Sequence, residues 1–110
     1  MRDTEAEIAG LRAVCPQAEG MSEGGSVFAF LPRLRFRAKG VTLCMDALLC
    51  PVAHSGYDTR LFLEQTVPGF AGAWYAQTIL SRPWQTISWR GVSPEQPWTR
   101  ILSEHLGAFA

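Results

Sequence analysis

The hydrophobic periodicity of this chain changes type along its length, from helical near the start to strand-like in the middle and back to helical at the end. Between Asp3 and Val14, Ile8 and Leu11 are spaced to share one helical face. From Ser26 to Glu64 the apolar residues instead form short runs and alternations, which are typical of β-strands. Consecutive strands flanked by helices predict an α+β fold with a sequential antiparallel meander, rather than alternating βαβ units.

The first segment is predicted to be a short amphipathic helix over Asp3–Val14. Thr4 and Glu7 have the spacing of a capping box. The helix should end at Cys15, because a residue that precedes proline avoids helical dihedral angles. The polar stretch 17–25 contains three glycines and is predicted to be a connector.

Strands are expected in the middle of the chain and in its tryptophan-rich part. Pro32 is expected to interrupt the first of them, and Lys39-Gly40 should form a turn. The segments with strand patterns are Ser26–Leu31, 33–37, Val41–Cys50, Thr59–Glu64, Trp74–Leu80 and Trp84–Arg90.

Three arginines, Arg33, Arg35 and Arg37, alternate with Leu34 and Phe36. This alternation predicts a half-buried strand or an edge ribbon with a basic outer face. Two interpretations remain open for that face. It is either a solvated edge that resists aggregation or a docking surface for an acidic partner.

A second helix is predicted at the end of the sequence. Ser93, Pro94 and Gln96 form a helix-start signal, although Pro97 favours a later start at Gln96. The apolar face of this helix would consist of Trp98, Ile101, Leu102, Leu106 and Phe109.

Composition excludes several function classes. The 110 residues are expected to form one domain (1–110), and ten basic against ten acidic side chains argue against nucleic acid as the main partner. No apolar run approaches the ~20 residues of a membrane span, and no signal peptide is evident, so no membrane partner is expected. Three widely spaced cysteines fit reduced thiols in a cytoplasmic protein.

Recognised enzyme motifs do not occur. A glycine-rich phosphate loop is absent, and the two histidines, His54 and His105, are far apart, so neither a cofactor nor a metal is expected. His105 borders the apolar face of the last helix, where a packed histidine or one at the solvent edge is expected rather than a catalytic base. His54 lies in a loop and is interpreted as part of a turn. Cys44 and Cys50 should share a strand face, and Cys50 is either core filler or a nucleophile.

Several short stretches resemble one protein family. These are Leu48-Leu49-Cys50-Pro51, then Tyr57 with Leu61-Phe62-Leu63, then 82–89 (Arg-Pro-Trp-Gln-Thr-Ile-Ser-Trp), followed by the closing helix. In this order they resemble the bacterial ubiquitin-conjugating-enzyme-like (UBC fold) families found with ubiquitin-like modifiers, activating enzymes and JAB-type peptidases. The resemblance implies a compact UBC-like fold for most of the chain.

The resemblance also implies a site. In that fold the nucleophilic cysteine lies roughly eight residues before a Trp-Ser-Pro-like turn that introduces a helix. The counterpart of that turn is Trp89 with Ser93-Pro94, and the count back from Trp89 reaches Ser81. No cysteine follows Cys50, and no His-Pro-Asn motif is present.

Three roles follow from the resemblance. Ser81 would accept the C-terminal carboxyl of a ubiquitin-like modifier as an oxyester, after delivery by an activating-enzyme-like protein, with Arg82, Gln85 and Trp89 shaping the site. In the second role the domain is a non-catalytic binding or adaptor module, with Trp74 and Trp98 partly exposed at an interface. In the third, Cys50 is the nucleophile.

Overall fold

The computed structural model describes residues 3–53 and 56–110. The described chain contains two α-helices, one short 3₁₀ helix and six strands. In chain order they are α1 (Thr4–Leu11), β1 (Glu19–Glu23), β2 (Ser26–Ala38), β3 (Val41–Cys50), β4 (Arg60–Leu63), β5 (Tyr75–Ile79), β6 (Arg82–Thr86), α2 (Trp98–Leu106) and η1 (Gly107–Phe109).

The six strands form one antiparallel sheet in the order β1-β2-β3-β4-β6-β5. The first four strands are sequential neighbours, which confirms the predicted antiparallel meander and the α+β class. The order reverses at the end, because the β5–β6 hairpin attaches to β4 through its second strand, with Leu63 opposite Gln85.

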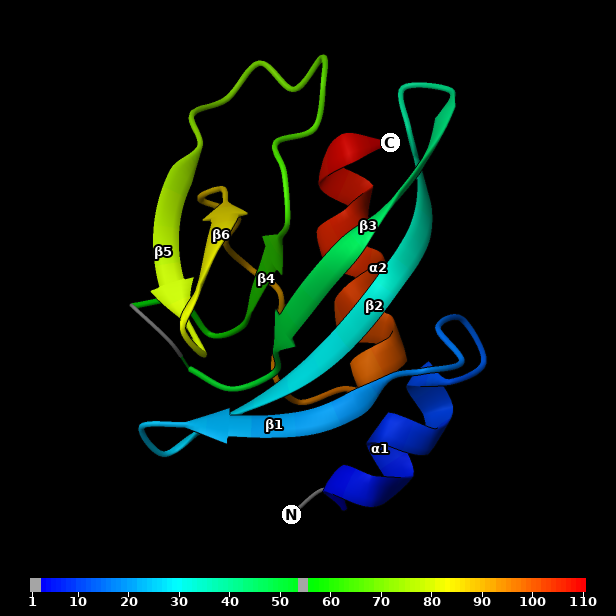
Figure 1. Cartoon of the computed structure of the whole chain (residues 1–110), viewed down its shortest axis with the longest axis vertical. Coiled ribbons are helices and arrows are strands. Elements are labelled where there is room, and N and C mark those ends of the chain that lie inside the picture. Colours follow the sequence, from blue (N-terminus) through cyan, green and yellow to red (C-terminus); the bar gives the residue numbers. More distant parts are fainter. Residues whose placement is uncertain (1–2, 54–55) are drawn as a thin grey trace.

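Both α-helices pack on one face of the sheet, with α2 passing behind β2 and β3 and α1 below it (Figure 1). The larger apolar core lies between these helices and the sheet. It includes Leu11 from α1, Ile101 from α2, and Leu34, Leu49 and Leu63 from the strands, all almost completely buried. Burial of these side chains is the main term that holds the helices to the sheet.

A second, smaller core lies on the opposite face, because the sheet curls until its last hairpin meets its first strands. The rings of Phe30 on β2 and Trp84 on β6 are 6.3 Å apart in an edge-to-face arrangement. The backbone N–H of Leu80 donates to Oε2 of Glu23 at 2.6 Å, which ties the β5–β6 turn to β1. The buried members of this inner core are Phe28, Leu48, Cys50, Phe62, Ile79 and Trp84.

The ends of both helices differ from the predicted ones. Asp3, rather than Thr4, caps α1, since its side chain accepts from the N–H of Glu5 at 3.1 Å. The Ser93 hydroxyl accepts from the backbone N–H of Glu95, as a helix-capping serine does, but this bond closes only an isolated turn before α2. The helix begins at Trp98 because prolines interrupt the preceding segment.

Two strand predictions are wrong. The stretch 17–25, expected to be a connector, contains the edge strand β1. Pro32 does not end the preceding strand, because β2 continues through an irregularity between Leu31 and Leu34. Arg33 there has a φ of 54°, and its N–H donates to Oδ1 of Asp46 at 2.8 Å, which stabilises the bulge.

Neither described helix has the length and apolar character that crossing a membrane requires.

Candidate functional site

Ser81 lies in the two-residue turn that joins β5 to β6, and its side chain is exposed. Leu80 and Ser81 both have positive φ angles, 55° and 61°, as in a type I′ hairpin turn. Within residues 3–53 and 56–110, no base is hydrogen-bonded to the Ser81 hydroxyl. Because a serine hydroxyl needs such a base to become a strong nucleophile, the turn presents an accessible but unactivated group.

The residues expected to shape a site around Ser81 have other contacts. Nη2 of Arg82 lies 3.0 Å from Oδ2 of Asp46 and 3.8 Å from Oε2 of Glu64, so its charge is already paired. The same guanidinium lies 4.4 Å from the ring centroid of Trp84. Gln85 is half-buried within the sheet, opposite Ala76 and Leu63.

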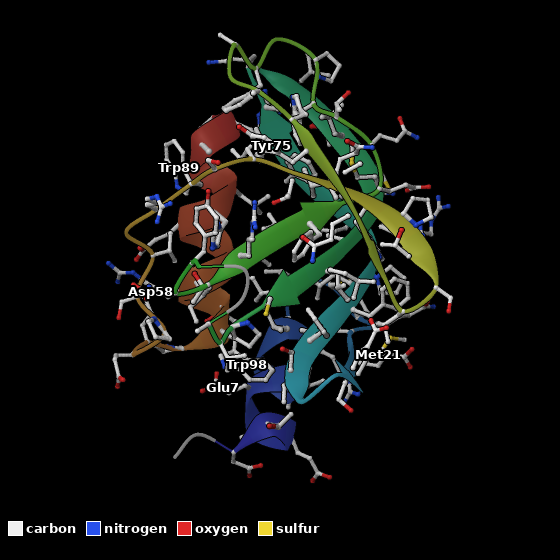
Figure 2. All side chains as sticks on the ribbon, turned by 90° about the vertical axis from the view of Figure 1, so that its left-hand side faces the viewer. Glu7, Met21, Asp58, Tyr75, Trp89 and Trp98 are labelled. Carbon is white, nitrogen blue, oxygen red and sulfur yellow. The ribbon has the colours of Figure 1, made fainter. Side chains whose placement is uncertain are left out.

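Trp89 and Trp98 occupy very different environments. Trp89 follows β6 at the end remote from Ser81 and is 38% exposed, whereas Trp98 is only 5% exposed. A strand advances about 3.3 Å per residue, so the extended β6 separates Ser81 from Trp89. The expected exposure of Trp98 is wrong, because this side chain packs in the core where α2 meets α1. At that contact the backbone N–H of Trp98 donates to Oε1 of Glu7 at 3.0 Å (Figure 2).

Cys50 belongs to the inner core and is completely buried. Burial raises the pKa of its thiol to about 11, and its Sγ donates to the carbonyl of Val52 at 3.4 Å. A thiol that stays protonated at neutral pH and has no solvent access is unreactive, so the geometry favours the core-filler role.

The described histidine, His105, is packed inside the protein. Its Nε2 lies 2.8 Å from Oγ1 of Thr59, and that hydroxyl donates to the carbonyl of Val92 at 2.9 Å. Since the hydroxyl proton is used for Val92, Nε2 must donate to Thr59. Burial lowers the pKa of His105 to about 4, which keeps the ring neutral. His54 lies outside the described residues, and the described part of the chain holds no cluster of three or more metal-ligating side chains.

The free edge of β2 is the most prominent surface feature beyond these residues. β1 pairs with Ser26–Phe30, so the later part of β2, Leu34–Ala38, has β3 as its one strand neighbour in the part of the chain that the structure describes. The two-residue turn at Lys39-Gly40 makes Ala38 and Val41 a hydrogen-bonded pair. By the alternation of an antiparallel ladder, the backbone N–H and C=O groups of Arg35 and Arg37 then point away from β3.

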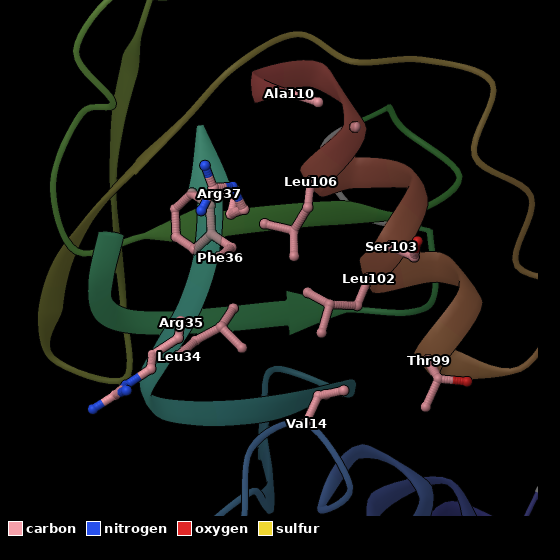
Figure 3. A pocket seen from close by; sticks show the side chains of 11 residues that line it. Val14, Leu34, Arg35, Phe36, Arg37, Thr99, Leu102, Ser103, Leu106 and Ala110 are labelled. Carbon is pink, nitrogen blue, oxygen red and sulfur yellow. The ribbon is translucent and has the colours of Figure 1, made fainter. Parts of the chain in front are cut away.

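A groove of about 490 Å³ runs between this edge and α2 (Figure 3). Leu34 and Leu102 face one another across it, and Phe36 and Leu106 continue the apolar lining. Val14, which is 56% exposed, stands at one end. Leu34, Phe36 and Leu102 are buried, so the apolar surface that the groove offers beside the unpaired backbone groups comes from Val14 and Leu106.

Arg35 and Arg37 belong to the strand that borders the groove, and their exposed side chains lie on the face of β2 opposite to Leu34 and Phe36. Arg37 donates to Oγ1 of Thr42 and to the carbonyl of Gly40, which are neutral groups. Among the described residues, neither arginine has a carboxylate within ion-pair distance. The alternation of arginines with apolar residues predicted the basic face, but the groove depends on the position of α2, which the sequence pattern does not specify.

Comparison with known proteins identified no matching family model, no matching curated protein and no matching solved structure.

Proposed function

We propose that this protein is a binding module that takes an extended segment of a partner protein as an additional strand along the free edge of β2. The observation that carries the proposal is the coincidence of an unpaired strand edge with an apolar groove. An added strand gains main-chain hydrogen bonds, and its alternate side chains enter pockets that give specificity.

The two faces of β2 define the side-chain pattern of the partner. Residues of the added strand on the helix side would enter the groove beside Val14 and Leu106, so they should be apolar. Residues on the opposite side would lie beside Arg35 and Arg37, so they should be acidic. The occupant is therefore a segment in which apolar and acidic residues alternate.

Charge also argues against a second copy of this chain as the occupant. Antiparallel pairing of two β2 edges would place the arginines of one copy close to those of the other, and like charges on neighbouring strands destabilise a sheet. Arginines alone would suffice to keep an edge from aggregating. Protection of the edge against aggregation does not require the apolar groove that lies beside the arginines.

The resemblance to the UBC-like family remains part of this proposal. The order of α1, a four-stranded antiparallel meander and a C-terminal helix supports it. On that basis the first partner to test is a ubiquitin-like modifier, held through its C-terminal segment in a cytoplasmic bacterial pathway. This corresponds to the non-catalytic adaptor role.

Binding is tested with fluorescently labelled ten-residue peptides and anisotropy measurements. A peptide of alternating isoleucine and glutamate should bind saturably and more weakly as salt increases, whereas its lysine counterpart should not bind. Arg35→Glu combined with Arg37→Glu should weaken binding at least tenfold. Equal binding of the two peptides, or no effect of the double substitution, would contradict the proposal.

A pair of substitutions on α2 separates the groove from the general surface. Ser103 lines the groove and is exposed, so Ser103→Trp should fill the groove and block the peptide. Arg100 is exposed on the same helix but does not line the groove, so Arg100→Trp is the matched control and should bind normally.

Covalent transfer is the second candidate, supported by the exposure of the Ser81 hydroxyl. The protein is incubated with a ubiquitin-like modifier, its activating enzyme and ATP. An oxyester at Ser81 would resist thiol reductants, hydrolyse in hydroxide and disappear in Ser81→Ala. Absence of any adduct, together with peptide binding that survives Ser81→Ala, would leave the adaptor role alone.

A further inference from the structure

Two arginines lie against one tyrosine ring on the side of the molecule that carries Trp89. The guanidinium carbon of Arg60 is 4.1 Å from the ring centroid of Tyr57, and that of Arg90 is 4.4 Å from it. The two guanidinium groups are therefore closer to each other than about 10 Å, the distance over which charges interact in dilute salt. This cluster lies apart from the β2 groove, whose lining includes none of the three residues.

Arg60 is the unusual member, because it is buried and has no counter-ion among the described residues. Only 7% of its surface is exposed, and its Nε has no hydrogen-bond partner. Its side chain covers the end of the inner core, with the guanidinium 5.7 Å from the ring centroid of Phe62. Burial and the neighbouring charge of Arg90 lower its pKa. A buried, unpaired cation is costly for the folded protein.

No carboxylate of the described residues neutralises this pair. Asp58 is next to Tyr57 in sequence, yet it forms no ion pair with Arg60 or Arg90. The Tyr57 hydroxyl donates to Oγ of Ser88 at 2.7 Å, and Arg90 contacts the carbonyl of Gly56 at 3.5 Å. The cluster therefore carries an excess of positive charge that a bound anion would compensate.

A small cavity of about 70 Å³ adjoins the cluster. Tyr57, Thr59 and Arg90 line it, together with Asp58 and Trp89, which lie on the same side of the molecule (Figure 2). Cavities that enclose drug-sized ligands have about 300–1,000 Å³, so this one suits only a small group. Its size matches one carboxylate or one phosphate, and its lining contains the guanidinium of Arg90 as well as the carboxylate of Asp58.

We propose that the cavity beside Tyr57 binds a small oxyanion, either a carboxylate or a phosphate group, with Arg90 as its direct ligand and Arg60 as the second positive charge. Arginine suits this role because its planar fork of N–H donors matches the oxygens of both groups. The anion is either free in solution or the end group of a larger ligand that extends out of the cavity.

The test is a titration of the ¹⁵N-labelled protein with sodium phosphate, sodium acetate or sodium chloride at constant ionic strength. The proposal predicts saturable shifts of the Trp89 indole N–H and the Gly91 and Val92 amide signals with phosphate or acetate. Saturation by phosphate alone identifies a phosphate site, and saturation by acetate alone a carboxylate site. Saturation by both identifies a general oxyanion site.

Substitutions decide whether the cluster is responsible. Arg90 is exposed, so Arg90→Gln should fold normally and should weaken anion binding roughly tenfold or more. Arg100→Gln removes an exposed arginine elsewhere and should leave binding unchanged. A linear response, a response to chloride equal to that with the other anions, or saturation unaffected by Arg90→Gln would overturn the proposal. Loss of peptide binding to the β2 edge would not affect it.

Discussion

The imidazole Nε2 of His105 and the hydroxyl of Thr59 lie 2.8 Å apart inside the core, joining α2 to the residue before β4. The Thr59 hydroxyl also donates to the carbonyl of Val92, so Nε2 of the imidazole must carry a proton, and burial, which lowers the pKa of His105 to about 4, keeps the ring neutral. The two residues thus couple the packing of the last helix to the protonation of one buried ring.

This coupling predicts a specific loss of stability in mild acid. The pKa of His105 is about 4 in the folded protein and about 6.5 when unfolded. Below pH 6.5 the unfolded chain binds a proton that the folded protein does not, so the free energy of unfolding decreases as pH falls toward 4. The full loss is on the order of 3 kcal/mol.

Urea unfolding between pH 7.5 and 4.5 measures this loss of stability, with His105→Gln as the comparison. The substitution should lower stability at pH 7.5 and should also flatten the pH dependence. Identical slopes for the two proteins would contradict the assignment.

Asp46 is predicted to stabilise the curled sheet at two points. Its carboxylate accepts from the N–H of Arg33 in the β2 bulge and pairs with Arg82 on β6. Asp46→Ala should therefore lower the free energy of unfolding by about 1–3 kcal/mol. Glu104→Ala, which removes an exposed partner of Arg100, should cost less than about 0.5 kcal/mol. Chemical denaturation of both variants checks the contrast, and similar losses would refute it.

Replacement of Ser81 by glycine should stabilise the protein. Its φ of 61° is strained for a residue with a Cβ atom but not for glycine. We expect Ser81→Gly to raise the free energy of unfolding by about 0.5–1 kcal/mol. Ser103→Gly, in the interior of α2, should lower it by a similar amount. Thermal denaturation measures both, and a destabilised Ser81→Gly would show that the Ser81 side chain stabilises the turn.

The three cysteines should react with alkylating agents at very different rates. Cys44 is exposed, whereas Cys15 and Cys50 are buried and burial raises the pKa of each buried thiol. Iodoacetamide at pH 8 should therefore modify Cys44 first in the native protein, and all three after denaturation. Peptide mapping by mass spectrometry identifies the sites. Rapid modification of Cys50 in the native state would favour the nucleophile role of this residue over the core-filler role.

Sequence patterns predicted the parts of this fold that bury apolar side chains. Val41–Cys50 and Arg60–Leu63 form strands within the expected segments, and the Lys39-Gly40 turn lies where glycine predicted it. β1 was missed because its five residues are mostly exposed and pair with β2 through the backbone. A strand of this kind has no side-chain periodicity to detect.

The candidate sites were less predictable than the fold. Arg35 and Arg37 stood out by their alternation, but the apolar groove exists only because α2 lies beside their strand. The cluster at Tyr57 brings together Arg60 and Arg90, which are thirty positions apart in the sequence. One local signal was present, since Arg60 directly precedes the apolar run 61–63, where a charged side chain is unusual.

Amide hydrogen exchange along β2 tests the central claim most directly. In the free protein, Phe36 and Ala38 should exchange slowly because β3 accepts their N–H groups, whereas Arg35 and Arg37 should exchange rapidly. Addition of the alternating isoleucine–glutamate peptide should protect Arg35 and Arg37. Unchanged exchange at both residues with the peptide bound, or slow exchange there in the free protein, would contradict strand addition at this edge.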